Sequence, residues 1–126
     1  VTKKRVVVCF AYTQFDPSMI QAAFGKNMYD YLVENTMLDD ETFLPINKPE
    51  AVFCLYRKDD IDELNRHFAV TRLHYVGTDM FAHYNREMLH DMDEAMFERY
   101  VGYTRTICEN DNLVGVSNHV LDILRK

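Results

Sequence analysis

The run Val6-Val7-Val8-Cys9-Phe10-Ala11-Tyr12 decides how the rest of the sequence is interpreted. Its residues are all apolar, and β-branched and aromatic types dominate, which predicts a β-strand. A continuous apolar run is typical of a strand covered on both faces in a parallel α/β sheet. Such a strand normally has neighbours earlier in the chain, and only residues 1–5 precede it here. We therefore expect the sequence to begin partway through a larger fold.

The composition is that of an ordinary globular chain. With 126 residues, 48% hydrophobic and 27% charged, it is expected to form a single domain over 1–126. No apolar run is long enough to cross a bilayer, and no signal-peptide cleavage site follows the first strand. A net charge of −6, with Lys3-Lys4-Arg5 as the only basic cluster, argues against a nucleic-acid partner.

The cysteines favour a reducing compartment. Cys9, Cys54 and Cys108 are odd in number, lack C-x-x-C spacing and lie in apolar or amphipathic segments. This pattern indicates reduced core residues of a cytoplasmic protein.

Helices and strands are expected to alternate after the first strand. In the first half we expect a helix capped by Asp16 with Pro17 first and Glu34 last, a short strand over 51–57 and a helix over 58–68. In the second half we expect a main strand over 69–76, a helix over 80–90, a helix capped by Asp93 and a last strand over 113–124.

Several chemical motifs are absent from the sequence. The glycines are too far apart for a G-x-G-x-x-G or Walker loop: Gly25, Gly77, Gly102 and Gly115. The chain therefore lacks its own glycine cradle for a nucleotide or cofactor. No G-x-S-x-G or H-E-x-x-H occurs. His83 and His90 share a helix face without a third ligand, so no metal site is expected.

Three segments together resemble one known family. The first two are residues 6–12 and the block 52–73, which reads as a strand, a helix and a further strand. The third comprises Thr78-Asp79, Met92-Asp93-Glu94, Thr106-Ile107-Cys108-Glu109, Gly115-Val116-Ser117-Asn118-His119 and Ile123-Leu124-Arg125-Lys126. Together they resemble the C-terminal half of a class I S-adenosylmethionine-dependent methyltransferase. The third segment is similar to the tail of bacterial members of uncharacterised substrate.

The resemblance implies a Rossmann-like α/β sheet, or an α+β unit where this portion stands alone. The family places its seventh strand antiparallel between the fifth and the sixth. We therefore expect about three main strands in the order first, last, middle, with the last antiparallel, and four helices. The family's cofactor loop, ribose-binding acid and adenine pocket have no matching residues here. S-adenosylmethionine is thus expected to serve a complete enzyme and not to bind this chain alone.

Candidate substrate-binding residues follow the predicted parallel strands, because ligands of doubly wound sheets lie beyond the carboxyl ends of such strands. This rule selects Tyr12, Gln14 and Asp79. Tyr12 either lines a substrate pocket or packs beneath the next helix. Asp79 either orients a substrate amine or hydroxyl, or caps a helix that begins near Met80.

Three polar residues near the end of the chain complete the candidate set. Glu109 follows a helix C-terminus, where the macrodipole disfavours a carboxylate, so a salt bridge and a substrate contact both remain open. Asn118 and His119 interrupt an apolar segment and must be hydrogen-bonded. His119 is either a general base or substrate contact, or a satisfied core residue. No catalytic residue is assigned, because methyl transfer chiefly requires alignment of the nucleophile and exclusion of water.

Two functions are compatible with these observations. In the first, the chain is the C-terminal, substrate-side portion of a methyltransferase, inactive alone, with a cationic or small-molecule acceptor. In the second, it is a free-standing α+β interaction or dimerisation module without catalytic activity. The long apolar edge of residues 6–12 is expected to associate, either with a missing N-terminal half or with a second copy. No membrane partner is expected.

Overall fold

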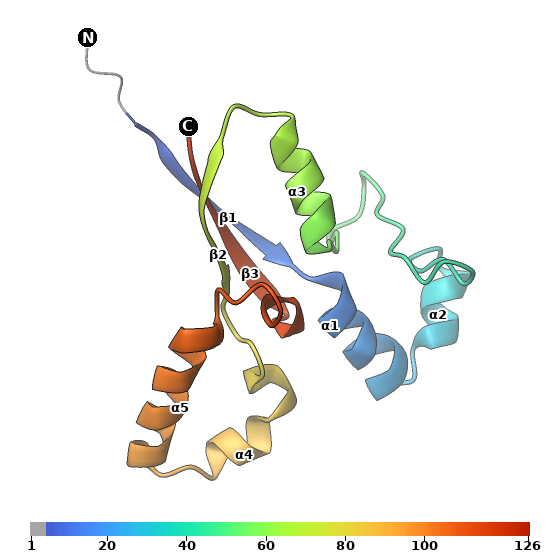
Figure 1. Cartoon of the computed structure of the whole chain (residues 1–126). Coiled ribbons are helices and arrows are strands. Elements are labelled where there is room, and N and C mark those ends of the chain that lie inside the picture. The colour runs from blue at the N-terminus through green and yellow to red at the C-terminus, as the bar shows by residue number, and fades with distance from the viewer. Residues whose placement is uncertain (1–4) are drawn as a thin grey trace.

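A three-stranded open sheet organises the molecule (Figure 1). The computed structural model describes residues 5–126, so Lys3 and Lys4 of the expected basic cluster lie outside the described residues. The strands β1 (Val7–Thr13), β2 (Thr71–Gly77) and β3 (His119–Arg125) pair in the order β1-β3-β2. β3 runs antiparallel to both neighbours, so β1 and β2 are parallel to each other. The predicted strand order and directions are confirmed, in an α+β arrangement.

The side chains of β3 alternate between a covered and a more open face. Val120, Asp122 and Leu124 are buried on the side that faces helix α3 (Lys58–Arg66). Ile61 of α3 joins Val120 in the core cluster, together with Tyr75 of β2. The helix over 58–68 was predicted with Asp59 or Asp60 as its cap. It ends at Arg66, and its N-cap is Arg57, whose backbone N–H donates to the Asp60 carboxylate at 2.7 Å.

The helix expected up to Glu34 is broken into three pieces. α1 (Phe15–Met19) continues as a π-helix, η1 (Ile20–Gly25), and α2 (Tyr29–Glu34) follows after a turn. The turn contains Asn27 at φ 53°, a left-handed conformation that ends a right-handed helix. The predicted start was also wrong, because Gln14 is the N-cap of α1 rather than Asp16.

The short strand expected over 51–57 is absent. Tyr56 instead makes an isolated parallel bridge with Gln14, in which the Tyr56 N–H donates to Thr13 O at 3.2 Å. Val52 and Phe53 are 90% and 78% exposed. The bridge at Tyr56 does not lengthen into a strand, because no neighbouring strand pairs with the backbone of this apolar run.

The second half of the chain contains shorter helices than expected. The segment 80–90 forms a 3-10 turn, η2 (Ala82–Tyr84), and a separate α4 (Arg86–His90). α5 (Glu94–Ile107) begins after Asp93, whose Oδ1 accepts from the Met96 N–H at 2.8 Å, as predicted. The described residues thus contain five α-helices, one more than expected.

The last strand is shorter than the predicted 113–124. The 3-10 helix η3 (Val114–Val116) takes up the first apolar residues, and Val114 is buried in the core. Ser117 and Asn118 therefore precede β3 instead of lying at its centre. Apolar residues on a tight turn and on a strand give the same local pattern, which explains the misplaced boundary.

β1 lies at the edge of the sheet and exposes apolar side chains. The expected cover on both faces is wrong for this chain, since Val7 is 57% and Phe10 is 47% exposed. Cys9 is also exposed rather than a core residue, and all three cysteines are free. Within residues 5–126, no helix combines the length and apolar character needed to span a membrane.

Candidate functional site

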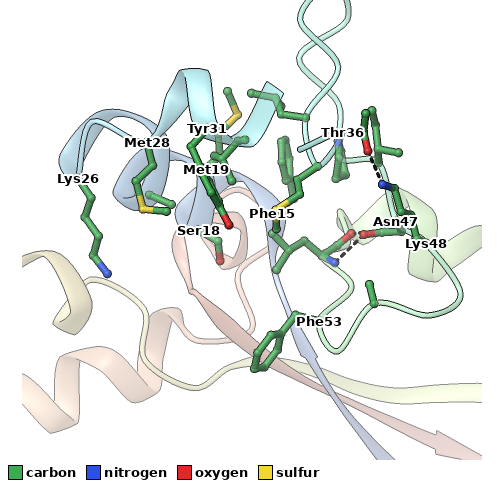
Figure 2. A pocket seen from close by; sticks show the side chains of 18 residues that line it. Phe15, Ser18, Met19, Lys26, Met28, Tyr31, Thr36, Asn47, Lys48 and Phe53 are labelled. Carbon is green, nitrogen blue, oxygen red and sulfur yellow. Dashed lines mark hydrogen bonds between the residues drawn. The ribbon is translucent and has the colours of Figure 1, made fainter. Parts of the chain in front are cut away.

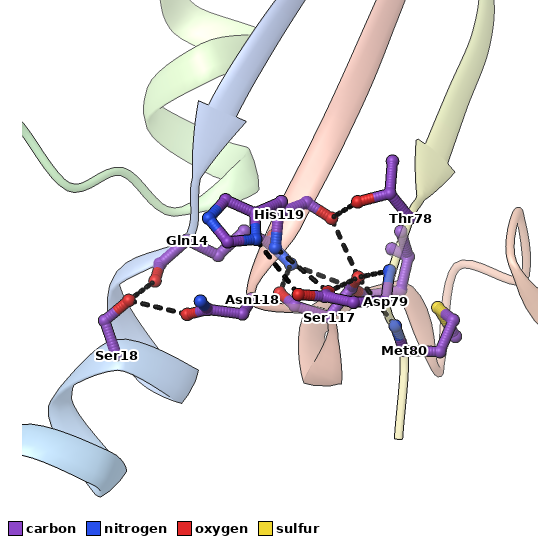
Figure 3. Close-up of polar contacts among 9 residues, drawn as sticks. Gln14, Ser18, Thr78, Asp79, Met80, Ser117, Asn118 and His119 are labelled. Atoms are coloured by element: carbon purple, nitrogen blue, oxygen red, sulfur yellow. Dashed lines mark hydrogen bonds and ion pairs between the residues drawn. The ribbon is translucent and has the colours of Figure 1, made fainter. Parts of the chain in front are cut away.

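Polar side chains gather where β1 and β2 end and β3 begins (Figure 3). Because β1 and β2 are parallel, their carboxyl ends lie at the same end of the sheet. β3 runs the opposite way and starts there. The cluster contains four of the predicted site residues: Gln14, Asp79, Asn118 and His119.

Asp79 is the acceptor at the centre of this cluster. Its Oδ1 accepts from the Ser117 hydroxyl at 2.6 Å and from the His119 backbone N–H at 3.1 Å. Its Oδ2 lies 3.0 Å from Nδ1 of the His119 ring. Burial alone raises the pKa of the Asp79 carboxyl, but these hydrogen bonds outweigh burial and hold the pKa below its usual value. Asp79 therefore remains an anion at neutral pH, and it does not cap a helix at Met80.

Ser117 fixes the loop after β2. Its side chain is fully buried, and its Oγ accepts from the Met80 N–H at 2.9 Å while donating to Asp79. The backbone approaches closely here: a Cβ on Gly77 would lie 2.3 Å from Met80 Sδ and 2.9 Å from Ser117 Cβ. Gly77 is the residue that allows β2, Met80 and Ser117 to meet.

His119 keeps one ring nitrogen available to solvent. Its side chain is 55% exposed, so it is not a core histidine. When Nδ1–H donates to Asp79, the neutral ring carries its lone pair on Nε2. Nε2 has no hydrogen-bond partner among the described residues. An oriented imidazole of this kind can accept a proton from a molecule on the solvent side.

Gln14 and Asn118 position the backbone around this pair. Gln14 is buried, and its Nε2 donates to Val114 O at 2.8 Å and to Ser117 O at 2.6 Å. Its amide hydrogens are therefore used within the protein. The Asn118 Oδ1 accepts from the Ser18 hydroxyl at 2.8 Å, which ties the start of β3 to α1.

The other two candidate residues lie elsewhere. Tyr12 packs edge-on against Tyr56, with ring centroids 5.8 Å apart, on the sheet face toward α3. Burial, reinforced by the nearby Asp122 carboxylate, raises the pKa of its hydroxyl. The Glu109 carboxylate lies 2.7 Å from Nδ1 of His74 in an exposed ion pair beside the middle of β2. The Glu109 carboxylate therefore has a partner within this chain.

A buried charge cluster on β3 was not predicted. The Asp122 side chain is fully buried, and Arg72 donates to its two oxygens from Nε at 2.6 Å and Nη2 at 2.8 Å. Asn65 of α3 donates to the same carboxylate at 2.8 Å, and Arg72 also binds Asp62. These bonds, led by the one to Asp122, raise the pKa of the Arg72 guanidinium. The available signal was a single acidic residue within the apolar run Val120-Leu121-Asp122-Ile123-Leu124.

The glycines of residues 5–126 lie apart and do not form the cofactor loop of the family that the sequence resembles. The space above Gly77 is filled by Met80 and Ser117 of this chain, and Gly102 and Gly115 have no atom within 4 Å of a built Cβ. No glycine cradle is therefore formed over residues 5–126. In the same range, no group of three or more His, Cys, Asp or Glu side chains is arranged to hold a metal ion.

Comparisons with known proteins found no match for this chain among protein-family models or curated proteins.

Proposed function

We propose that this chain forms the acceptor-side part of an S-adenosylmethionine-dependent methyltransferase sheet. The observation that carries the proposal is the strand order, in which β3 lies antiparallel between the parallel strands β1 and β2. Consecutive strands are usually neighbours, so an order in which the last strand separates the first two is uncommon. It is the arrangement of the fifth, seventh and sixth strands in the family that the sequence resembles.

The outer edge of β1 offers further support. The Gln14 N–H donates to Asn118 O, and the Lys126 N–H donates to Val6 O. Because hydrogen bonds alternate along an antiparallel pair, the amides of Val7, Cys9 and Ala11 point away from β3. These three residues are exposed. Such an edge can pair with a strand supplied by a segment other than residues 5–126.

The inner face of β1 is also incompletely covered. An apolar groove of about 520 Å³ runs between β1 and the end of α3. Phe10, Leu64 and Phe68 line it and are 47%, 45% and 62% exposed. Exposed aromatic and aliphatic side chains on one contiguous surface favour cover by another protein segment.

The Asp79–His119 pair supplies the chemistry proposed for this part of the sheet. S-adenosylmethionine supplies an activated methyl group when bound, and its binding falls to the part of the sheet beyond β1. The His119 Nε2 takes the proton from an N–H or O–H of the acceptor. Asp79 holds the ring in the required tautomer and stabilises the imidazolium. The acidic balance of the chain favours a cationic or neutral small-molecule acceptor.

The proposal is tested with the product of the complete reading frame that encodes this sequence. Calorimetric titration with S-adenosylmethionine is expected to show saturable binding to that product and none to residues 1–126 alone. A complete product that does not bind the cofactor overturns the methyltransferase assignment. Tight binding by residues 1–126 alone overturns the assignment of this chain to the acceptor side.

The exposed edge of β1 also favours a second candidate function, an interaction module that dimerises without catalysis. Pairing of β1 with β1 of a second copy would satisfy the outward amides of Val7, Cys9 and Ala11. Sedimentation of residues 1–126 over a range of concentrations separates the candidates. A reversible dimer together with no cofactor binding by the complete product favours this second function, and a monomer throughout contradicts it.

A further inference from the structure

A cavity of about 600 Å³ lies between the α1–η1–α2 segment and the loop of residues 36–55 (Figure 2). This volume falls within the range of small-molecule sites, which are mostly apolar with a few polar groups. Its walls include Phe15, Tyr31 and Phe53 and three flexible methionines, Met19, Met28 and Met37. Methionine side chains adapt their shape to an apolar ligand more readily than branched residues do.

The charged residues that line the cavity are both lysines. Its 18 lining residues include Lys26 and Lys48 but no aspartate or glutamate. This is unusual in a chain with 20 acidic and 14 basic residues. Neither lysine forms an ion pair among the described residues, and the Lys48 ammonium donates to the Thr36 hydroxyl. Figure 2 shows the two lysines on opposite sides of the cavity.

The backbone around the cavity adopts uncommon conformations. η1 is a π-helix, a form that often occurs at functional sites. Asn27 and Thr36 have φ values of 53° and 52°, and both lie at turns that border the cavity. For a β-branched residue such as Thr36 this conformation is strained, and such strain persists where the surrounding structure imposes it. The hydroxyl of Thr36 accepts a hydrogen bond from the Lys48 ammonium.

We propose that this cavity binds an amphipathic anion, with its apolar body among the methionine and aromatic side chains. The anionic head contacts the Lys48 ammonium, which Thr36 holds in place and which retains further N–H donors. Lys26 adds a weaker attraction from the other side. The apolar walls exclude a purely ionic ligand, and the absence of lining carboxylates disfavours a cation.

The cavity also contacts the Asp79–His119 site through one residue. Ser18 lines the cavity, and its hydroxyl donates to Oδ1 of Asn118, the residue before His119. A bound molecule that displaces the Ser18 hydroxyl would therefore act on the start of β3. The binding proposal itself does not depend on the methyltransferase assignment, because it uses only residues of this chain.

Methionine methyl NMR of this chain tests the proposal with octanoate as the probe. The seven methionines provide an internal control. The signals of Met19, Met28 and Met37 are expected to shift and saturate, and those of Met80, Met88, Met92 and Met96 to stay in place. Shifts of all seven signals, or of none, overturn the proposed site. Octylammonium that binds as tightly as octanoate overturns the assignment to anions.

Substitutions separate the two parts of the site. Lys48→Gln is expected to weaken octanoate binding about tenfold, because a hydrogen bond to a charged group is lost. Lys26→Gln is expected to weaken it about twofold. Arg99→Gln removes a positive charge on α5, away from the cavity, and leaves the affinity unchanged. Ala51→Trp fills the cavity and abolishes binding, and unchanged affinity in this variant contradicts the proposal. These outcomes are independent of cofactor binding by the complete reading-frame product.

Discussion

Asp122 and Asp79 lie in or next to the same sheet but differ in their surroundings. Asp122 is fully buried at the centre of β3, and Arg72 and Asn65 occupy its two oxygens. Asp79 lies at the end of β2, and its partner His119 remains 55% exposed. The first arrangement is closed, because every partner is bound within the protein. The second is open, because one nitrogen of His119 faces solvent.

This difference separates a structural role of the Asp122 cluster from the chemical role that we propose for Asp79 and His119. A buried ion pair rarely adds much net stability, but removing one partner leaves an uncompensated charge. The Asp122–Arg72 pair, extended by Asp62, joins α3, β2 and β3. The Asp79–His119 pair instead orients a titratable ring toward solvent, which is the geometry that proton transfer requires.

Asp122→Ala is expected to produce the largest effect. The variant leaves the Arg72 guanidinium without its main partner and lowers the free energy of unfolding by about 3–5 kcal/mol. Urea unfolding measures this loss. The double variant Asp122→Leu/Arg72→Met, which removes both charges, is expected to lose less than the single variant. If the single variant lowers the free energy of unfolding by less than about 1 kcal/mol, Asp122 and Arg72 do not behave as a buried pair whose members depend on each other.

Asp79→Ala is expected to have an intermediate and pH-dependent effect. Loss of the acceptor for the buried Ser117 hydroxyl and the His119 amide costs about 1–3 kcal/mol near neutral pH. The pKa of Asp79 is lower in the folded state than in the unfolded chain. Its contribution is therefore full above the unfolded pKa and is lost as the pH falls through the folded pKa.

The difference in unfolding free energy between the wild type and Asp79→Ala should accordingly shrink between about pH 7 and about pH 3. Urea titrations at the two pH values measure it. A difference that stays constant would mean that the Asp79 charge does not matter to the folded state.

His119→Gln is expected to separate stability from activity. The side chain is exposed, so the free energy of unfolding should change by no more than about 0.5 kcal/mol. In the complete reading-frame product, loss of a general base lowers the methyl-transfer rate about 10²-fold or more. His74→Gln is the matched control, because His74 also pairs with a carboxylate through Nδ1 and is equally exposed. Equal rates for both variants would exclude His119 as the base.

Arg66→Ala is expected to have the smallest effect. Arg66 pairs with Glu63 on the exposed side of α3, with 71% of its side chain in solvent. Exposed pairs of this kind contribute about 0–1 kcal/mol. Urea unfolding should give nearly the same free energy of unfolding for this variant as for the wild type. Arg66 lies on the same helix as Asn65, which donates to the buried Asp122 carboxylate. If Arg66→Ala lowered the free energy of unfolding as much as Asp122→Ala does, exposed and buried pairs of this chain would not differ in their contribution to stability.

The sequence predicted the elements whose local pattern is unambiguous. β1, β2, α3 and α5 lie close to their expected positions. Continuous apolar runs, acidic first turns and the cap at Asp93 depend on neighbouring residues alone. The strand order came from the family resemblance and not from these local patterns.

The errors arose where tertiary contacts decide the conformation. Residues 114–116 form a 3-10 turn, and Val114 enters the core with Ile61 and Tyr75, which no local pattern reveals. Residues 51–57 had the composition of a strand but only one bridging position, at Tyr56.

Four of the six predicted site residues meet at the strand ends, whereas Tyr12 and Glu109 lie elsewhere. The strand-end rule selected Asp79, and the polar interruption selected Asn118 and His119. Their hydrogen bonds depend on the close approach at Gly77, which is visible only in three dimensions. The partnership of Asp122 with Arg72 likewise follows from the pairing of β2 with β3.

Amide hydrogen exchange along β1 tests most directly whether this strand lies inside a larger sheet. The inward amides of Val8, Phe10 and Tyr12 should be protected both in residues 1–126 and in the complete reading-frame product. The outward amides of Val7, Cys9 and Ala11 should exchange rapidly in dilute residues 1–126 and become equally protected in the complete product. Rapid exchange of these three amides in the complete product would contradict the proposed sheet.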